Sequence, residues 1–126
     1  SDQEWADFVE AHHDFVSCYI LQKCDDGEPL AFIYLLKEYD DEMIVSIHGG
    51  GWSKPLLYYR GYILMLRTLM ERGYKVRTYC NLNNTSAIRF SRSVGFIPYR
   101  YTDSKVLMWI SERTLKNTAL YKRFYK

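Results

Sequence analysis

Residues 48–55 combine residue types and spacing suited to binding an anion. They read HGGGWSKP, with three consecutive glycines directly after an apolar run. Glycine allows backbone conformations closed to other residues and lets a ligand come close to the main chain. Ser53 is suited to cap a helix, and Pro55 suits its first turn. Exposed amides at such a helix start, with Lys54 beside them, would form a phosphate site, although many folds share this pattern.

His48 lies at the mouth of this predicted glycine loop. An imidazole titrates close to neutral pH, so it can accept a proton from a reacting group under ordinary conditions. By residue type and location His48 is the best candidate for a general base. The alternative is a histidine at a strand end that is bonded to a turn carbonyl, and the sequence gives both interpretations equal weight.

Residues 75–96 form the second informative stretch and read as a strand, a polar turn and a short helix. Residues 75–80 alternate polar and apolar side chains, which is the period-2 pattern of a strand. Asn83 or Asn84 can N-cap the helix that follows, because a side-chain oxygen there accepts an otherwise unused amide proton. Gly95 can take the left-handed position after the last turn.

Within this stretch Asn84-Thr85-Ser86-Ala87-Ile88, followed by Gly95-Phe96, resembles the N-x-x-A-I…G-F signature of the GNAT superfamily of N-acetyltransferases. The resemblance implies an α+β fold of the α/β/α mixed-sheet kind, the GNAT-like acyl-CoA N-acyltransferase fold. Its central sheet is mostly antiparallel and contains one splayed parallel strand pair, between which acetyl-CoA lies. A capped helix that ends in Gly-Phe also arises without any cofactor, so the order of the other elements has to support the assignment.

The other elements follow the order that the resemblance requires. Hydrophobic periodicity and turn residues predict a helix, three antiparallel strands, a glycine loop, a helix that stops at Gly73, a strand, a helix and two strands. We expect a single GNAT-like domain over residues 1–126, made of an N-terminal helix (1–16), a core (17–110) and a basic C-terminal helix (111–126). The expected strands are Ser17–Gln22, Leu30–Leu36, Met43–Ile47, Lys75–Cys80, Phe96–Tyr101 and Val106–Ile110, and the central helix is Lys54–Arg72.

Charge is distributed unevenly along the chain. Residues 1–42 hold twelve acidic and two basic side chains (net −10), and residues 43–126 hold fifteen basic and three acidic ones (net +12), which sum to the overall +2. The basic part could attract a polyanion, either coenzyme A or a nucleic acid, or the two parts could neutralise each other on folding. We favour partial neutralisation with one local anion site. Three cysteines without CxxC pairs argue against a disulfide framework and against a metal site, and favour a reducing cytoplasm.

The family resemblance assigns cofactor contacts residue by residue. Backbone groups at the end of the third strand would pair with the pantetheine arm of acetyl-CoA, and amides at the following helix start would take its pyrophosphate. Asn84 would lie near the pantetheine on the other side of the cleft. One departure concerns the family's R-x-x-G-x-G/A loop, whose equivalent positions, 53–58, contain no glycine here. The candidate cofactor-binding residues are Ile47, His48, Gly49, Lys54, Pro55, Leu56, Leu57, Asn84 and Phe90.

A second departure concerns the proton donor. The family's general acid is a tyrosine in the motif helix, and the equivalent catalytic position here is Ser91. A serine hydroxyl has a pKa far above that of a phenol, so it gives up a proton to a leaving thiolate poorly. Tyr99, Tyr101 or water could take this role, or the enzymatic activity has decayed.

Three hypotheses follow. The first is an N-acetyltransferase that transfers the acetyl group of acetyl-CoA to a primary amine by direct attack. The second is a catalytically degenerate GNAT fold that serves as a binding or assembly factor. The third is a nucleic-acid-associated protein, which we favour least. The acceptor stays open between an amine-bearing small molecule and a protein. No apolar run is long enough to span a membrane, and twelve tyrosines leave enough aromatic surface for a homodimer.

Overall fold

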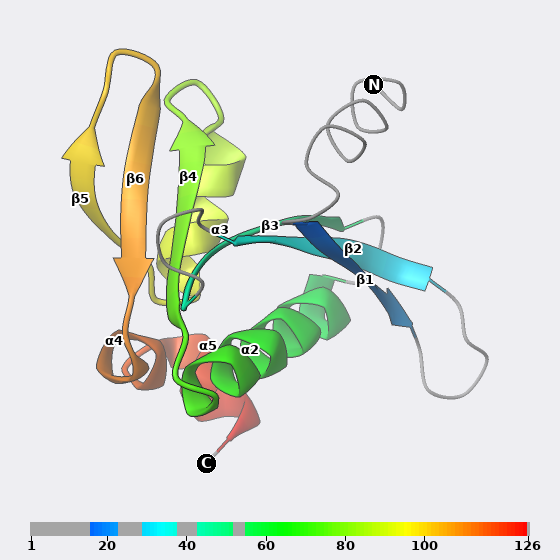
Figure 1. The fold of residues 1–126 in the computed structure, drawn as a ribbon. Helices are drawn as coiled ribbons and strands as arrows, with labels where there is room; N and C mark the ends of the chain where they lie inside the picture. Colours follow the sequence, from blue (N-terminus) through cyan, green and yellow to red (C-terminus); the bar gives the residue numbers. More distant parts are fainter. Residues whose placement is uncertain (1–15, 23–28, 38–42, 52–54, 126) are drawn as a thin grey trace.

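The computed structural model describes residues 16–22, 29–37, 43–51 and 55–125 of the chain. These residues form six strands and four helices (Figure 1), in the predicted order as far as the last strand. The strands are β1 (Val16–Gln22), β2 (Pro29–Lys37), β3 (Ile44–Gly51), β4 (Lys75–Asn81), β5 (Ile97–Tyr101) and β6 (Lys105–Ile110), and the helices are α2 (Pro55–Glu71), α3 (Thr85–Ser93), α4 (Glu112–Lys116) and α5 (Ala119–Phe124).

The described strands form one sheet with the order β1-β2-β3-β4-β6-β5. Strands β1, β2 and β3 make an antiparallel meander, and β4, β6 and β5 are also antiparallel to their neighbours. The pair β3–β4 is parallel, because helix α2 carries the chain back between them. The predicted α+β fold with a mostly antiparallel sheet and one parallel pair is therefore confirmed.

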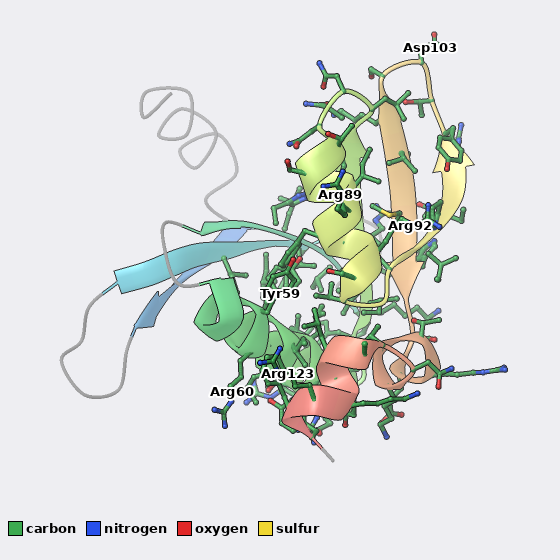
Figure 2. The ribbon with its side chains drawn as sticks, turned by 180° about the vertical axis from the view of Figure 1, so that it is seen from behind. Tyr59, Arg60, Arg89, Arg92, Asp103 and Arg123 are labelled. Atoms are coloured by element: carbon green, nitrogen blue, oxygen red, sulfur yellow. The ribbon has the colours of Figure 1, made fainter. Side chains whose placement is uncertain are left out.

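The hydrophobic core lies between the sheet and helices α2 and α3. Alternation along β4 and β6 puts one set of side chains into this core, and these are Val76, Thr78, Cys80, Val106, Met108 and Ile110. Helix α2 contributes Ile63 and Leu66, both fully buried, and the chain after α3 contributes Phe96. Figure 1 shows α3 behind β4, and the rotated view of Figure 2 shows α3 in front. The opposite face of β4, β6 and β5 thus points away from both helices.

Helix α3 begins and ends as its sequence predicts. Its N-cap is Asn84, whose Oδ1 accepts a hydrogen bond from the backbone N–H of Ala87 at 3.1 Å. At the other end Gly95 has φ +112°, and the N–H of Phe96 donates to the carbonyl of Ser91 at 3.0 Å. This is the Schellman arrangement, which satisfies carbonyls that the helix leaves unpaired.

Two predicted elements differ in the structure, and a third lies outside the described residues. The glycines of residues 49–51 are strand residues rather than a loop, since β3 continues through Gly51 and pairs there with Ala31 of β2. The prediction of a single helix over 111–126 is wrong, because the chain forms the two helices α4 and α5 instead. Thr118 interrupts it with extended backbone angles and caps α5 with its side chain. The helix expected over residues 1–16 lies outside the described residues, apart from Val16 in β1.

None of the described helices is long and apolar enough to cross a membrane.

Candidate functional site

The parallel strands β3 and β4 separate shortly after they begin. Their register covers three residue pairs and ends at Ser46 and Arg77. One residue further along each strand, the Thr78 hydroxyl donates a buried hydrogen bond of 2.8 Å to the carbonyl oxygen of Ile47. A side chain therefore replaces the next backbone ladder bond. Beyond it the two strands continue with different partners, β2 for β3 and β6 for β4.

Beyond the separation, one edge of β3 has no neighbouring strand among the described residues. Strand β3 stays paired with β2 as far as Gly51, so its other edge is the one that faces the gap. Backbone polar groups alternate sides along a strand, so those of Gly49 point to the same side as the Ile47 carbonyl. Gly49 is exposed to solvent. An extended ligand can therefore pair with the Gly49 backbone, and the predicted positions Ile47 and Gly49 both lie on this edge.

His48 lies on the opposite side of the sheet from the core, where it meets the first aromatic residue of β4 beyond the paired region. Its imidazole contacts the ring of Tyr79 edge to face, with ring centroids 4.4 Å apart. The side chain is largely buried, and burial lowers the pKa of His48 to about 4, helped by the positive charge of Lys105. His48 is therefore neutral at pH 7 and able to accept a proton, with low basicity.

Tyr79 and Lys105 connect His48 to the rest of this sheet face. The Lys105 Nζ lies 4.5 Å from the centroid of the Tyr79 ring, a cation–π contact from β6 to β4. Along the same face the guanidinium of Arg77 lies 5.5 Å from the Trp109 ring. The Tyr99 ring of β5 packs against the same Trp109 ring, with the two ring centroids 5.6 Å apart. Aromatic and cationic side chains thus alternate across the three strands.

Two of the predicted cofactor residues lie on helix α3. The side chain of Asn84 is engaged in capping the helix, so its oxygen bonds to the helix's own backbone. Phe90 packs against Tyr59 and Tyr62 of α2, with ring centroids 4.8 and 4.9 Å apart. Figure 2 shows Tyr59 on the side of α2 toward α3. This aromatic cluster joins the two helices that flank the separated strands.

Ser91, the residue at the family's general-acid position, is buried in the core. Its Oγ lies 3.6 Å from the Sγ of Cys80 on β4. Ser91 therefore lies on the face of the sheet that the helices cover. Burial raises the pKa of the Cys80 thiol, which is therefore a neutral buried side chain. Cys80 is a free cysteine. His48 and Ser91 lie on opposite faces of the sheet.

The predicted pyrophosphate site is described only in part. Pro55, Leu56 and Leu57 form the first turn of α2, so this helix start follows β3 as expected. Lys54 lies outside the described residues. Among the residues that the structure describes, no three histidine, cysteine or acidic side chains are grouped as a metal site would require.

Sequence reasoning did not single out Thr78, Tyr79 or Lys105. The alternation in β4 was a sufficient signal for which face each side chain occupies, because it puts Tyr79 on the polar face and Thr78 on the core face. Lys105 becomes a neighbour of Tyr79 through the β4–β6 register, in which it pairs with Asn81. Hydrophobic periodicity does not predict this register, because the register depends on how the chain between β4 and β6 folds.

Comparisons with known proteins identify the fold. Neither a protein-family model nor a curated protein matches the sequence. Solved structures match it over most of the chain. One is AAC(6')-Ib in complex with ribostamycin and coenzyme A, with TM-score 0.69, 17% identity, and coverage of 89% of this chain and 72% of that one. Another is the N-acetyltransferase PseH of Campylobacter jejuni in complex with acetyl coenzyme A, with TM-score 0.65, 10% identity, and coverage of 87% and 79%.

A third match is a chimera of the spermidine N-acetyltransferase SpeG from Vibrio cholerae and hSSAT, with TM-score 0.68, 10% identity, and coverage of 93% and 80%. At these identities the likeness defines the fold. The described chain therefore has the GNAT fold in divergent form, and the family resemblance of its motif helix is confirmed at the level of the fold.

Proposed function

We propose that the protein is an acetyl-CoA-dependent N-acetyltransferase that acts on a primary amine. The observation that carries the proposal is the separation of β3 from β4, bridged by the hydrogen bond from Thr78 to Ile47. It leaves the exposed backbone of Gly49 facing a gap between two parallel strands. A neutral imidazole, His48, stands beside the gap.

The residues around the gap fit the extended, amide-containing arm of acetyl-CoA. The backbone N–H and C=O of Gly49 are available to pair with the pantetheine amides, as a neighbouring strand would. The carbonyl of Ile47 has one lone pair directed to Thr78 and a second one for a ligand. The first turn of α2 and Lys54 would take the phosphates, because helix starts carry unpaired amides and a partial positive charge. Asn84 and Phe90 would border the arm from the side of α3.

The chemistry proposed is direct transfer. The lone pair of the acceptor amine attacks the acetyl carbonyl carbon, a C–N bond forms and the C–S bond of the thioester breaks. His48 takes the proton that the amine loses, directly or through a water. The coenzyme A thiolate leaves and takes a proton from water, because Ser91 is buried on the other face of the sheet. Holding both reactants at the gap supplies much of the rate enhancement.

Calorimetric titration of acetyl-CoA tests the proposal. We expect micromolar binding to the wild type and about tenfold weaker binding to Lys54→Glu, since reversing a charge beside a phosphate removes one favourable ion pair and adds a repulsion. Lys122→Glu is the matched control, because this exposed lysine on α5 undergoes the same charge change and should leave binding unchanged. Absence of binding to the folded wild type would contradict the proposal.

Turnover separates the enzyme from the degenerate GNAT fold that serves as a binding or assembly factor. The burial of Ser91 against Cys80 favours this second candidate, because the family's acid position here provides no exposed hydroxyl. A protein that binds acetyl-CoA and releases free thiol only in the presence of an amine acceptor is an enzyme. One that binds acetyl-CoA without turnover with any acceptor belongs to the second class. The free, buried Cys80 fits the cytoplasmic location that the sequence leads us to propose.

A further inference from the structure

The sheet face that carries His48 continues across β4, β6 and β5. We call this surface the outer face and define it by the residues Arg77, Tyr79, Tyr99, Arg100, Lys105, Leu107 and Trp109. The register places Arg77 opposite Trp109, and Leu107 between Tyr79 and Arg100. Helices α2 and α3 pack on the other side of the sheet, so neither of them covers it (Figures 1 and 2).

Among the residues that the structure describes, the charged side chains of the outer face are all positive. This face holds three cations, one on each strand, and Lys105 and Arg100 form no ion pair with the part of the chain that the structure describes. The three described acidic residues lie elsewhere: Glu71 and Glu112 line a small cavity between α2 and α4, and Asp103 is at the tip of the β5–β6 hairpin in Figure 2. A ligand on this face therefore meets positive charge beside the imidazole of His48.

The arrangement of the aromatic rings decides between two kinds of anionic ligand. Single-stranded nucleic acid would need ring faces on which bases can stack. Here Lys105 lies over the ring of Tyr79 and Arg77 lies over the ring of Trp109, so each of these two rings already has a cation on it. The cations with their aromatic supports instead suit carboxylates carried by an extended chain.

We propose that the outer face binds an acidic peptide segment and that the acetyl acceptor is the α-amino group at the start of that segment. This inference rests on the proposed acetyl transfer. The α-amine would enter the gap beside His48 and Tyr79, and the residues that follow it would lie along Lys105, Arg100 and Arg77. Its nitrogen forms the new bond to the acetyl carbon, its proton passes to the His48 imidazole, and coenzyme A leaves as the thiol after taking a proton from water.

The low basicity of the site agrees with this acceptor. An α-amino group has a pKa of about 8, whereas a lysine ammonium titrates near 10.4, so far more of the α-amine is already neutral at pH 7 to 8. A smaller fraction of an α-amine than of a lysine or a polyamine must therefore lose a proton before it reacts. A weakly basic imidazole is sufficient for such an acceptor. The nearby charge of Lys105 also disfavours a polycationic acceptor.

Three matched peptides test the acceptor class with acetyl-CoA as donor. The first has a free α-amine followed by three acidic residues, the second has three basic residues in their place, and the third is blocked at its α-amine and carries one lysine. Thiol release and peptide mass give kcat/KM for each. We expect kcat/KM for the acidic peptide to exceed that of both others by about tenfold or more, which is the effect of a complementary charge arrangement. Equal rates, or a preference for the basic or the lysine peptide, would overturn the proposal.

Binding gives a second readout that does not depend on turnover. The acidic peptide, labelled at its C-terminal end, is followed by fluorescence anisotropy in the presence of coenzyme A. Lys105→Glu should weaken its binding about tenfold, and Lys122→Glu should not change it. Binding of this peptide without binding of acetyl-CoA would support the peptide-binding surface and contradict the acetyltransferase function. Tighter binding of a single-stranded oligonucleotide than of the acidic peptide would overturn the surface assignment.

Discussion

The imidazole of His48 lies edge to face against the ring of Tyr79, with the ring centroids 4.4 Å apart. The two residues belong to parallel strands, and each stands two positions beyond the last pair of their register, Ser46 with Arg77. Their contact therefore marks the place where the strands separate. The imidazole is largely buried here, and this burial sets its protonation state.

The buried imidazole makes folding stability depend on pH. His48 has a pKa of about 4 in the folded chain and 6.5 as a model group, so between these values the unfolded chain binds more protons. Stability is then fully present above pH 6.5 and is lost as pH falls toward 4. We expect wild type to lose about 2 to 3 kcal/mol more than His48→Gln between pH 7 and pH 4.5. Urea unfolding of both proteins at the two pH values measures this difference, and equal losses would contradict it.

His48 should add a second protonation step to the acid limb of the activity profile. We expect kcat/KM to fall with slope one below the pKa of the acceptor amine, and with slope two below about pH 4, where His48 also protonates. His48→Gln should lower kcat/KM by about 10² to 10⁴ at pH 7.5. Lys105→Met should move the second step to higher pH, because the charge of Lys105 contributes to the lowered pKa of His48. Tyr79→Phe keeps the ring contact and serves as the control in which the second step stays in place.

Thr78 should matter both for stability and for the binding of acetyl-CoA. Thr78→Val keeps the shape of the side chain but leaves the buried carbonyl of Ile47 without its donor, which should cost about 1 to 3 kcal/mol in unfolding free energy. Thr78→Ser retains the hydroxyl and should retain most of both properties. Chemical denaturation and acetyl-CoA calorimetry of the three proteins test this. Equal stability of the valine and serine variants would show that the bridge is unimportant.

Ser91→Ala should leave acetyl transfer nearly unchanged. The hydroxyl is buried, and its described side-chain partner is the Cys80 thiol at 3.6 Å, so we expect a stability change of about 1 kcal/mol or less. Steady-state kinetics with the preferred acceptor provide the measurement. A fall in kcat of two orders of magnitude, with stability preserved, would instead assign Ser91 a direct catalytic role.

Gly95 should be much less tolerant of substitution than Gly73. Both have positive φ, +112° and +88°, so alanine is strained at either position. At Gly95 a Cβ would also lie 2.9 Å from the backbone Cα of Leu115, whereas at Gly73 the nearest atom is the flexible end of Met43 at 3.5 Å. We expect Gly73→Ala to cost about 1 kcal/mol and Gly95→Ala about 3 kcal/mol or more. Thermal unfolding of the pair tests this, and similar melting temperatures would refute it.

Local sequence patterns were sufficient for most of the fold. The alternation of residues 75–80 predicts which side chains of β4 are buried, and Asn84 and Gly95 fix both ends of α3 through capping and a positive φ. These features act over a few residues, so the sequence contains them completely. The order of the elements then pointed to the GNAT fold. Local signals gave a wrong prediction at Gly49–Gly51. Three consecutive glycines predict a loop, but backbone pairing with β2 makes them part of strand β3.

The tertiary structure alone decided how the site is composed. The sequence named His48 as a base but gave no reason for its lowered pKa, which comes from burial and from Lys105, a residue far away in the chain. It placed Ser91 by its motif position, whereas the packing of α3 on β4 buries this hydroxyl against Cys80. The outer face likewise depends on the β4–β6–β5 register. Periodicity shows which face a side chain is on, but only long-range strand pairing brings particular side chains together and sets the electrostatic environment in which they react.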